Sequence, residues 1–233
     1  MEPRDRLVVA VDRSSRQEIL ALVDALHGLA GVFKIGLQAF IVNGPDIVRE
    51  IVGRGERVFL DLKIHDIPHT AKRAVAEVAA LDVSLLTVHA SGGPSMLAAC
   101  AEGIVDSARP PLVLGVTILT SLDEAELESI GFHNDAIDNA VRLARVVRHA
   151  GLAGVVASPL EIGAIRDACG SDFVILTPGI RPAGSAAGDQ RRTLSPGRAI
   201  AEGADYLVVG RPITDAPSPR DAALAILDEI AAA

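Results

Sequence analysis

The sequence predicts an α/β protein, a single-domain (β/α)8 barrel that spans residues 1–233. Short β-branched runs alternate with amphipathic stretches along the whole chain, eight such runs occur, and polar residues recur where the runs end. Each run is continuously apolar, as expected for a parallel strand covered on both faces. The predicted strands are residues 7–12, 32–36, 58–63, 85–90, 112–119, 154–158, 173–179 and 206–211.

Amphipathic segments separate these runs and are typical of the helices that surround a barrel. Ser14 and Ser15 supply a start signal for the first helix, and the Gly-Gly-Pro at 92–94 opens the helix after the fourth strand. A doubly wound open sheet is the competing architecture, but it usually has fewer strands, and no G-x-G-x-x-G follows the first run. The predicted helices include 15–27, 70–81, 138–149 and 219–230.

The composition excludes several classes of protein. With 49% hydrophobic and 22% charged residues, the chain can build a large core and is not expected to be disordered. A net charge of −8 argues against a nucleic-acid partner, although one arginine and a few backbone N–H groups could still hold a single phosphate. No segment resembles a signal peptide or a membrane span, so we expect a cytoplasmic protein. Cys100 and Cys169 lack metal-like spacing and are predicted to be reduced, buried thiols.

Charged residues stand at or near the C-terminal ends of the predicted strands, where barrels place their chemistry. Asp12 ends the first strand, Lys34 lies within the second, and Asp61 and Lys63 close the third. Because strand side chains alternate, Asp61 and Lys63 should face the barrel mouth together while the leucines beside them face the helices. A structural salt-bridge network is the alternative interpretation, but buried ion pairs seldom add much stability, which favours a functional role.

A second polar region follows the last two predicted strands. The segment T-P-G-I-R-P at 177–182 enters a loop rich in Gly, Ala and Ser that ends at 188–192, and loops of this length are usually functional lids or disordered. The eighth strand ends in Gly210 and Arg211. Barrels commonly bind phosphate at this place, where a glycine admits the anion and an arginine grips two oxygens. A solvent loop with a surface arginine is the alternative.

The segment D-L-K-I-H-D-I-P-H-T at 61–70 resembles the D-x-K-x-x-D-I-P-x-T signature of the orotidine 5′-phosphate decarboxylases. The resemblance extends over nearly the whole chain, through Asp12, Lys34, the Thr-Ser at 120–121 and both phosphate segments. It implies conversion of orotidine 5′-phosphate to uridine 5′-phosphate, the last step of de novo pyrimidine nucleotide synthesis, with no metal and no cofactor. A bare D-x-K-x-x-D would identify only the broader superfamily of barrels.

The resemblance also implies a role for each matching residue. Lys63 matches the proton donor, Asp61 the group beside the scissile carboxylate, and Lys34 the residue that holds the array; with Asp66 they form the implied catalytic set. The family's contribution to the partner subunit's site implies a homodimer with shared sites, and its matching residues are Asp66, Ile67 and Thr70. The implied substrate-binding residues are Asp12, Lys34, Asp61, Ile67, Thr70, Thr120, Arg181, Gln190, Gly210 and Arg211, with Gln190 on the lid.

Two other functions fit parts of the pattern. A magnesium-dependent sugar-phosphate decarboxylase could share the barrel and the D-x-K-x-x-D, and a non-catalytic barrel could bind a phosphorylated metabolite as a sensor. His65 and His69 stand four apart, but Pro68 lies between them, so surface or interface histidines are preferred to a metal pair. We expect His89 to pack or hydrogen-bond at the barrel mouth rather than to act as an acid or base.

Overall fold

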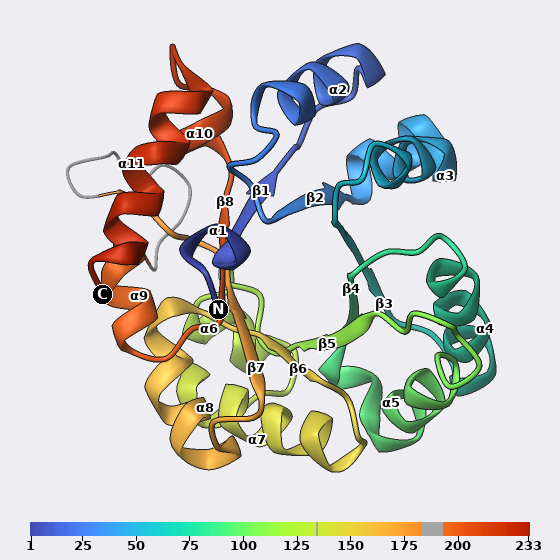
Figure 1. Ribbon diagram of the computed structural model, residues 1–233. Helices are drawn as coiled ribbons and strands as arrows, with labels where there is room; N and C mark the ends of the chain where they lie inside the picture. The colour runs from blue at the N-terminus through green and yellow to red at the C-terminus, as the bar shows by residue number, and fades with distance from the viewer. Residues whose placement is uncertain (134, 183–192) are drawn as a thin grey trace.

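The computed structural model describes residues 1–133, 135–182 and 193–233, and in this part of the chain eight parallel strands close into a barrel in chain order. Strand β1 pairs with both β2 and β8, which completes the ring. Helices surround the strands (Figure 1). The strands are β1 (Leu7–Ala10), β2 (Val32–Gly36), β3 (Val58–Ile64), β4 (Leu85–His89), β5 (Leu112–Val116), β6 (Gly154–Val156), β7 (Val174–Thr177) and β8 (Tyr206–Val209).

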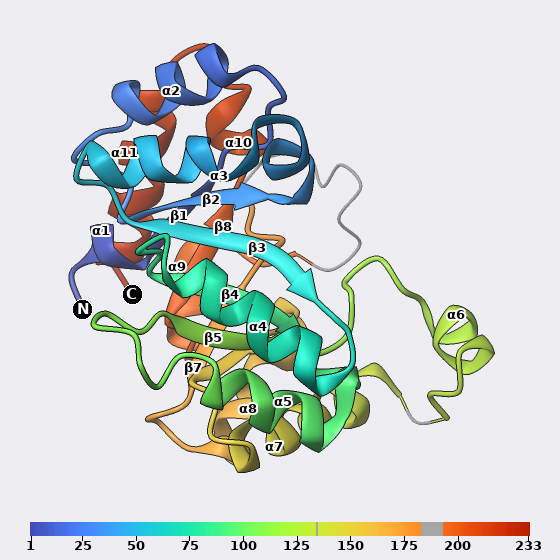
Figure 2. The same cartoon turned by 90° about the vertical axis from the view of Figure 1, so that its right-hand side faces the viewer.

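The helices cover the outside of the barrel, and short ones mark its two ends. Helix α1 (Pro3–Arg6) contacts β1 and β8 where the strands begin, whereas α6 (Glu124–Ser129) stands off the barrel at the opposite end (Figure 2). The other described helices are α2 (Arg16–Ala25), α3 (Leu37–Gly53), α4 (Pro68–Ala79), α5 (Gly93–Glu102), α7 (Ala136–His149), α8 (Ile162–Cys169), α9 (Pro196–Ala201), α10 (Arg211–Thr214) and α11 (Pro219–Ala231), with 3-10 turns η1 (Ala90–Gly92) and η2 (Pro159–Glu161).

Alternation along the strands divides the core into two layers. Val8 and Ala10 of β1 point into the barrel, while Leu7 and Val9 point outward into the larger layer between strands and helices. Because both faces of each strand are covered, the strands read as continuous apolar runs. The inner layer is formed by Val8, Ala10, Val32, Phe59, Leu85, Leu114, Leu176, Tyr206 and Val208.

The predicted barrel is confirmed, but most strands end earlier than the sequence suggests. Strand pairing in β5 stops at Val116, and the apolar residues Ile118 and Leu119 line a cavity instead. Arg211 begins helix α10 rather than ending the eighth strand. The apolar runs continue beyond the hydrogen-bonded strands because these additional residues line the mouth of the barrel.

Helix start signals in the sequence correspond to hydrogen-bonded caps. The Ser15 side chain accepts from the backbone N–H of Glu18 at the start of α2. Asp123 and Glu126 form a reciprocal capping box at the start of α6. Inside α3, Gly44 has a φ of 65° before Pro45, so this helix is broken at that point.

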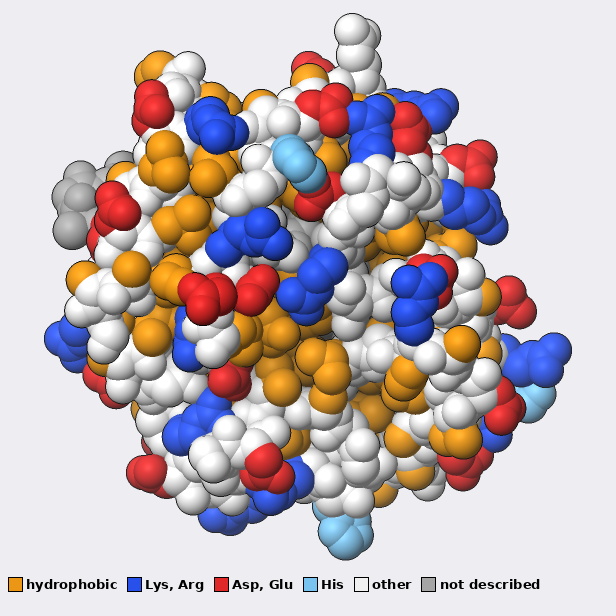
Figure 3. Space-filling model, viewed as in Figure 1, with side chains coloured by type: hydrophobic (Ala, Val, Ile, Leu, Met, Phe, Trp, Pro, Cys, Tyr) orange, Lys and Arg blue, Asp and Glu red, His pale blue; other side chains and the backbone are white. Residues whose placement is uncertain are grey.

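The cysteines are buried, and the surface carries charges of both signs. Within the described ranges no helix is both long enough and apolar enough to cross a membrane. Acidic and basic side chains are interspersed on the face drawn in Figure 3. Cys100 and Cys169 are free and buried, as predicted, and burial raises the pKa of the Cys100 thiol to about 11. This thiol is therefore protonated at neutral pH and unreactive.

Close contact between β6 and β7 makes Gly154 sensitive to substitution. A Cβ at this position would lie 2.1 Å from the carbonyl oxygen of Val174, which the barrel holds in place. We expect Gly154→Ala to lower the free energy of unfolding by about 3 kcal/mol, because the backbone must shift to admit the methyl group. Urea denaturation followed by circular dichroism measures this change.

The matched control is Gly163→Ala in α8, where a Cβ would meet nothing closer than 3.8 Å. It should raise stability by up to about 1 kcal/mol, and equal effects of the two substitutions would contradict the analysis.

Candidate active site

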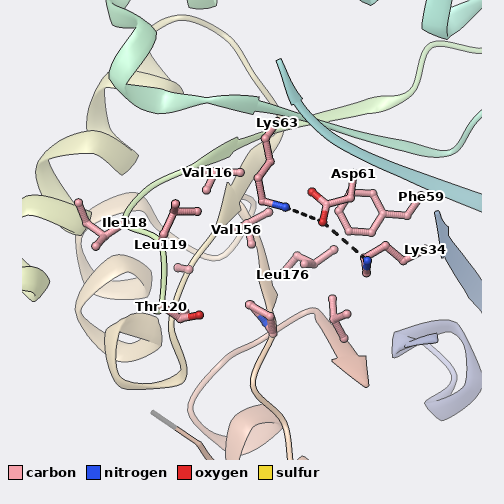
Figure 4. A pocket seen from close by; sticks show the side chains of 13 residues that line it. Lys34, Phe59, Asp61, Lys63, Val116, Ile118, Leu119, Thr120, Val156 and Leu176 are labelled. Carbon is pink, nitrogen blue, oxygen red and sulfur yellow. Dashed lines mark hydrogen bonds and ion pairs between the residues drawn. The ribbon is translucent and has the colours of Figure 1, made fainter. Parts of the chain in front are cut away.

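Charged side chains of β2 and β3 meet at the C-terminal end of the barrel (Figure 4), and Asp12, which follows β1, joins them. Lys63 Nζ lies 2.7 Å from Asp61 Oδ2, and Lys34 Nζ lies 3.9 Å from the same oxygen. On its other side, Lys34 donates to Asp12 Oδ1 at 2.8 Å. The structure thus brings Asp12, Lys34, Asp61 and Lys63 together as a continuous row of alternating charges, which we call the charged array.

The two middle residues of the charged array are buried, and the two outer ones are more exposed. The side chains of Lys34 and Asp61 are 10% and 13% exposed, whereas those of Lys63 and Asp12 are 37% and 58% exposed. A buried ammonium is costly unless it is paired, so Lys34 depends on both carboxylates. Gly36 leaves the space for this pairing, because a Cβ there would lie 3.0 Å from both Asp12 Oδ1 and Lys34 Nζ.

An irregularity in β3, rather than simple alternation, brings Lys63 to Asp61. Strand β3 pairs regularly with β4 up to Leu60 and resumes at Ile64, so the register shifts between these residues. Lys63 has a φ of 54°, in the left-handed region that costs a residue with a side chain about 1 kcal/mol or more. The two charges meet as predicted. The cause is the bulge in β3, however, and not the regular strand alternation that the sequence suggests.

Thr87 of β4 is a member of this site that the sequence interpretation missed. Its hydroxyl is fully buried, donates to Asp61 Oδ1 at 2.8 Å and accepts the backbone N–H of Lys63 at 3.0 Å. The available signal was a threonine inside the apolar run L-L-T-V-H, because a buried hydroxyl needs partners.

A cavity of about 200 Å³ opens beside the charged array. One wall carries the charges of Lys34, Asp61 and Lys63, and most of the remaining wall is apolar. Thr120, a predicted substrate-binding residue, also lines this cavity. A site with one charged and one apolar wall suits a flat ring that carries an anionic substituent. The full lining is Lys34, Phe59, Asp61, Lys63, Val116, Ile118, Leu119, Thr120, Val156, Ala157, Leu176, Pro178 and Val208.

A second cavity, of about 360 Å³, adjoins the first. Asp12, Arg181, Gly210 and Arg211 line it, so predicted residues from both ends of the chain meet here. Burial, and then the charge of Arg211, lowers the pKa of Arg181. Two guanidinium groups are therefore held near each other, where an anion would stabilise both. The residues shared by the two cavities are Lys34, Pro178 and Val208.

The loops after β1 and β8 meet at this second cavity. Gly210 precedes α10, and a Cβ there would lie 3.5 Å from the Cβ of Ala10. Arg13, which also lines the cavity, donates to the carbonyl of Thr214 and to the carboxylate of Asp215. This contact ties the loop after β1 to α10, and no sequence motif indicated it.

Three other predicted residues lie apart from both cavities. Asp66, Ile67 and Thr70 are exposed at the start of α4, and Ile67 is 67% exposed. The Asp66 carboxylate accepts the backbone N–H of Ile67 at 2.7 Å. The chain thus gathers three of the four predicted catalytic residues, Lys34, Asp61 and Lys63. Gln190 lies outside the described residues.

Comparison with known proteins identifies the family. A model of the orotidine 5′-phosphate decarboxylase / HUMPS family matches residues 5–226. The chain belongs to this family. Orotidine 5′-phosphate decarboxylase from Moorella thermoacetica is 50% identical, with 99% of this chain and 94% of the relative covered. The enzyme of that name from Syntrophotalea carbinolica is 48% identical, with 100% and 98% covered. The crystal structure of orotidine 5′-phosphate decarboxylase from Lactobacillus acidophilus matches with a TM-score of 0.85 and 32% identity, over 96% of this chain and 98% of that one.

Two histidines of this decarboxylase-family barrel lie beside the charged array. The ring centroids of His65 and His89 are 5.3 Å apart, with His65 exposed and His89 half-buried. Burial, followed by the charges of His65 and Lys63, lowers the pKa of His89, against an opposing effect of Asp61. His69 is exposed, and the described residues contain no group of three or more His, Cys, Asp or Glu side chains that could hold a metal.

We expect His89 to titrate below about 6.5, the ordinary histidine value. Lys63→Ala should raise the pKa of His89, because it removes a positive neighbour. Nuclear magnetic resonance of the imidazole C–H groups measures both midpoints. The pKa of His89 is lower in the folded state than in the unfolded state, so the folded state disfavours the protonated ring. The contribution of His89 to folding stability is therefore fully present above about pH 6.5 and is lost as the pH falls. A midpoint at or above the ordinary value would show that the ring is not desolvated.

Proposed function

We propose that this family member converts orotidine 5′-phosphate to uridine 5′-phosphate and carbon dioxide, with no metal or organic cofactor. The observation that carries the proposal is the charged array beside a largely apolar cavity that continues into an arginine-lined one. The two cavities match the two ends of a nucleotide whose base bears a carboxylate. Relatives that carry this enzyme's name at 48–50% identity support the choice of substrate.

The arginine-lined cavity is the proposed phosphate end. Arg181 and Arg211 provide two guanidinium groups, and the backbone at Gly210 allows close approach of an anion. Lys34 lines both cavities and donates to Asp12 in the second, and in this proposal the two residues bind the ribose hydroxyls. The pyrimidine then fills the first cavity with Thr120 at its edge. Binding energy from the phosphate can in this way hold the base against the charges.

The proposed chemistry places the pyrimidine carboxylate beside Asp61. Breaking the bond between C6 and the carboxylate releases carbon dioxide and leaves the electron pair on C6. Asp61 disfavours the substrate carboxylate relative to the transition state, because the negative charge leaves its neighbourhood as the bond breaks. The Lys63 ammonium stabilises the carbanion and donates a proton to C6, and neutral Lys63 regains a proton from water. Lys34 fixes the Asp61 carboxylate from the other side.

The fourth charged residue of the proposed set, Asp66, belongs in this proposal to a neighbouring subunit's site. Within one protomer it is exposed and lines neither cavity described above. Exposed apolar side chains follow β2 and β3 at the same end of the barrel, which supports a subunit interface there. They are Leu37, Ile41, Val42 and Ile67. In the resulting homodimer, Asp66, Ile67 and Thr70 would complete the partner's site.

The first test is an absorbance assay with purified protein, orotidine 5′-phosphate and excess EDTA. We expect rapid and complete conversion to the spectrum of uridine 5′-phosphate, because no proposed step uses a metal. An inactive but folded protein would refute the proposal. Turnover of a sugar phosphate that depends on added magnesium would instead assign the chain to the metal-dependent branch of related barrels.

Subunit mixing tests the shared site. Lys63→Ala and Asp66→Ala should each lose nearly all turnover, because each removes one charge from every site. Mixed in equal amounts and allowed to exchange subunits, the two variants should regain about a quarter of wild-type activity, since half of the dimers then contain one intact site. Lys72→Ala, which removes an exposed lysine paired with Glu102, is the control and should keep full activity. Mixtures that stay inactive despite subunit exchange would mean that Asp66 acts within its own protomer.

A further inference from the structure

Thr87 lies where the hydrogen-bonding ladder between β3 and β4 is interrupted. Regular pairing stops at Leu60 and resumes at Ile64, so three residues of β3 lie opposite the single β4 residue Thr87. Two of those three, Asp61 and Lys63, belong to the charged array. At this place the regular backbone hydrogen bonds between β3 and β4 are missing, so they do not hold the array residues in position. The Thr87 side chain lies there.

The two hydrogen bonds of Thr87 have a defined direction. A backbone N–H can only donate, so the Lys63 N–H at 3.0 Å uses an acceptor site of the Thr87 hydroxyl. The hydroxyl proton is then free to point at Asp61 Oδ1, which is 2.8 Å away. Since Thr87 is fully buried, water does not compete for this proton.

This contact sets the orientation of the Asp61 carboxylate. Oδ1 is held by the Thr87 hydroxyl, and Oδ2 is left to face both ammonium groups, at 2.7 Å from Lys63 Nζ and 3.9 Å from Lys34 Nζ. The same hydroxyl holds the backbone of Lys63, whose φ of 54° is unfavourable for a residue with a side chain. One group thus fixes both the carboxylate and the backbone that carries the neighbouring ammonium.

We propose that Thr87 is a positioning residue for decarboxylation, which acts by holding Asp61 and the Lys63 backbone in one arrangement before substrate binds. This inference rests on the proposed function. Thr87 does not line the cavity where the base is placed, so its effect must pass through the charged array. Charges that are preorganised in this way need not reorient during the reaction, which is where they lower the barrier.

Thr87→Val is the decisive substitution, because valine keeps the shape of the side chain and removes the hydroxyl. We expect kcat to fall by about 10- to 100-fold, the size expected for loss of a hydrogen bond to a charged acceptor, while KM is unchanged or lower. Thr87→Ser, which keeps the hydroxyl, should stay within about threefold of wild type. Both parameters come from the absorbance assay with orotidine 5′-phosphate.

Thr117→Val, directly after β5, is the matched control. Thr117 is also buried and donates to the carbonyl of Val156 at 3.1 Å, but this partner is not a member of the charged array. Its substitution should lower thermal stability about as much as Thr87→Val and leave kcat unchanged. If Thr87→Val does not fold, Thr87→Cys, whose thiol is a weak donor, is compared with Thr87→Ser.

The outcomes separate the two proposals. An inactive wild type would refute the proposed function itself. An active wild type with an unchanged kcat in Thr87→Val would overturn the role of Thr87 alone. Equal losses in Thr87→Val and Thr87→Ser would also overturn it, because they would assign the effect to packing rather than to the hydroxyl. An equal loss in Thr117→Val would reduce the effect to general destabilisation of the barrel.

Discussion

The pairing of buried Lys34 with two carboxylates is the interaction on which the rest of the site depends. Its ammonium is held between Asp12, which follows β1, and Asp61, which lies on β3; these are the two strands beside β2. Burial of an unpaired ammonium is prohibitive, so the three strand ends must keep one arrangement. Lys34 also lines both cavities. Its pairing therefore holds in place the junction between the first cavity, with its charged wall, and the arginine-lined second cavity.

The charges gain strength from their surroundings. The rest of the cavity wall beside the array is built mainly from Val, Ile and Leu side chains. In such a site electrostatic interactions are stronger than in water, and fixed charges replace a hydration shell that would have to rearrange. Structural stability alone does not explain the array, because isolated buried ion pairs are often no better than apolar residues of the same size.

The sequence was sufficient for the barrel, because continuous apolar runs and capped helices report burial directly. It also placed Asp12, Lys34, Arg181 and Arg211 at one end of the barrel, since strand ends carry polar side chains there. The sequence could not reveal the bulge at Lys63, because regular strand alternation already predicts that Asp61 and Lys63 lie on the same face. The role of Thr87 was hidden for a related reason: its partners are a backbone N–H and a residue from another strand. The ends of the strands were overestimated, because apolar lining and strand pairing have the same composition.

Closure of the barrel has a consequence for the second cavity. Asp12 follows the first strand and Gly210 the last, yet they line one cavity because β1 pairs with β8. The arginine-lined end can exist only after the final strand has docked against the first. An anion that binds there therefore stabilises the closed barrel relative to any open form, because it binds only the closed one.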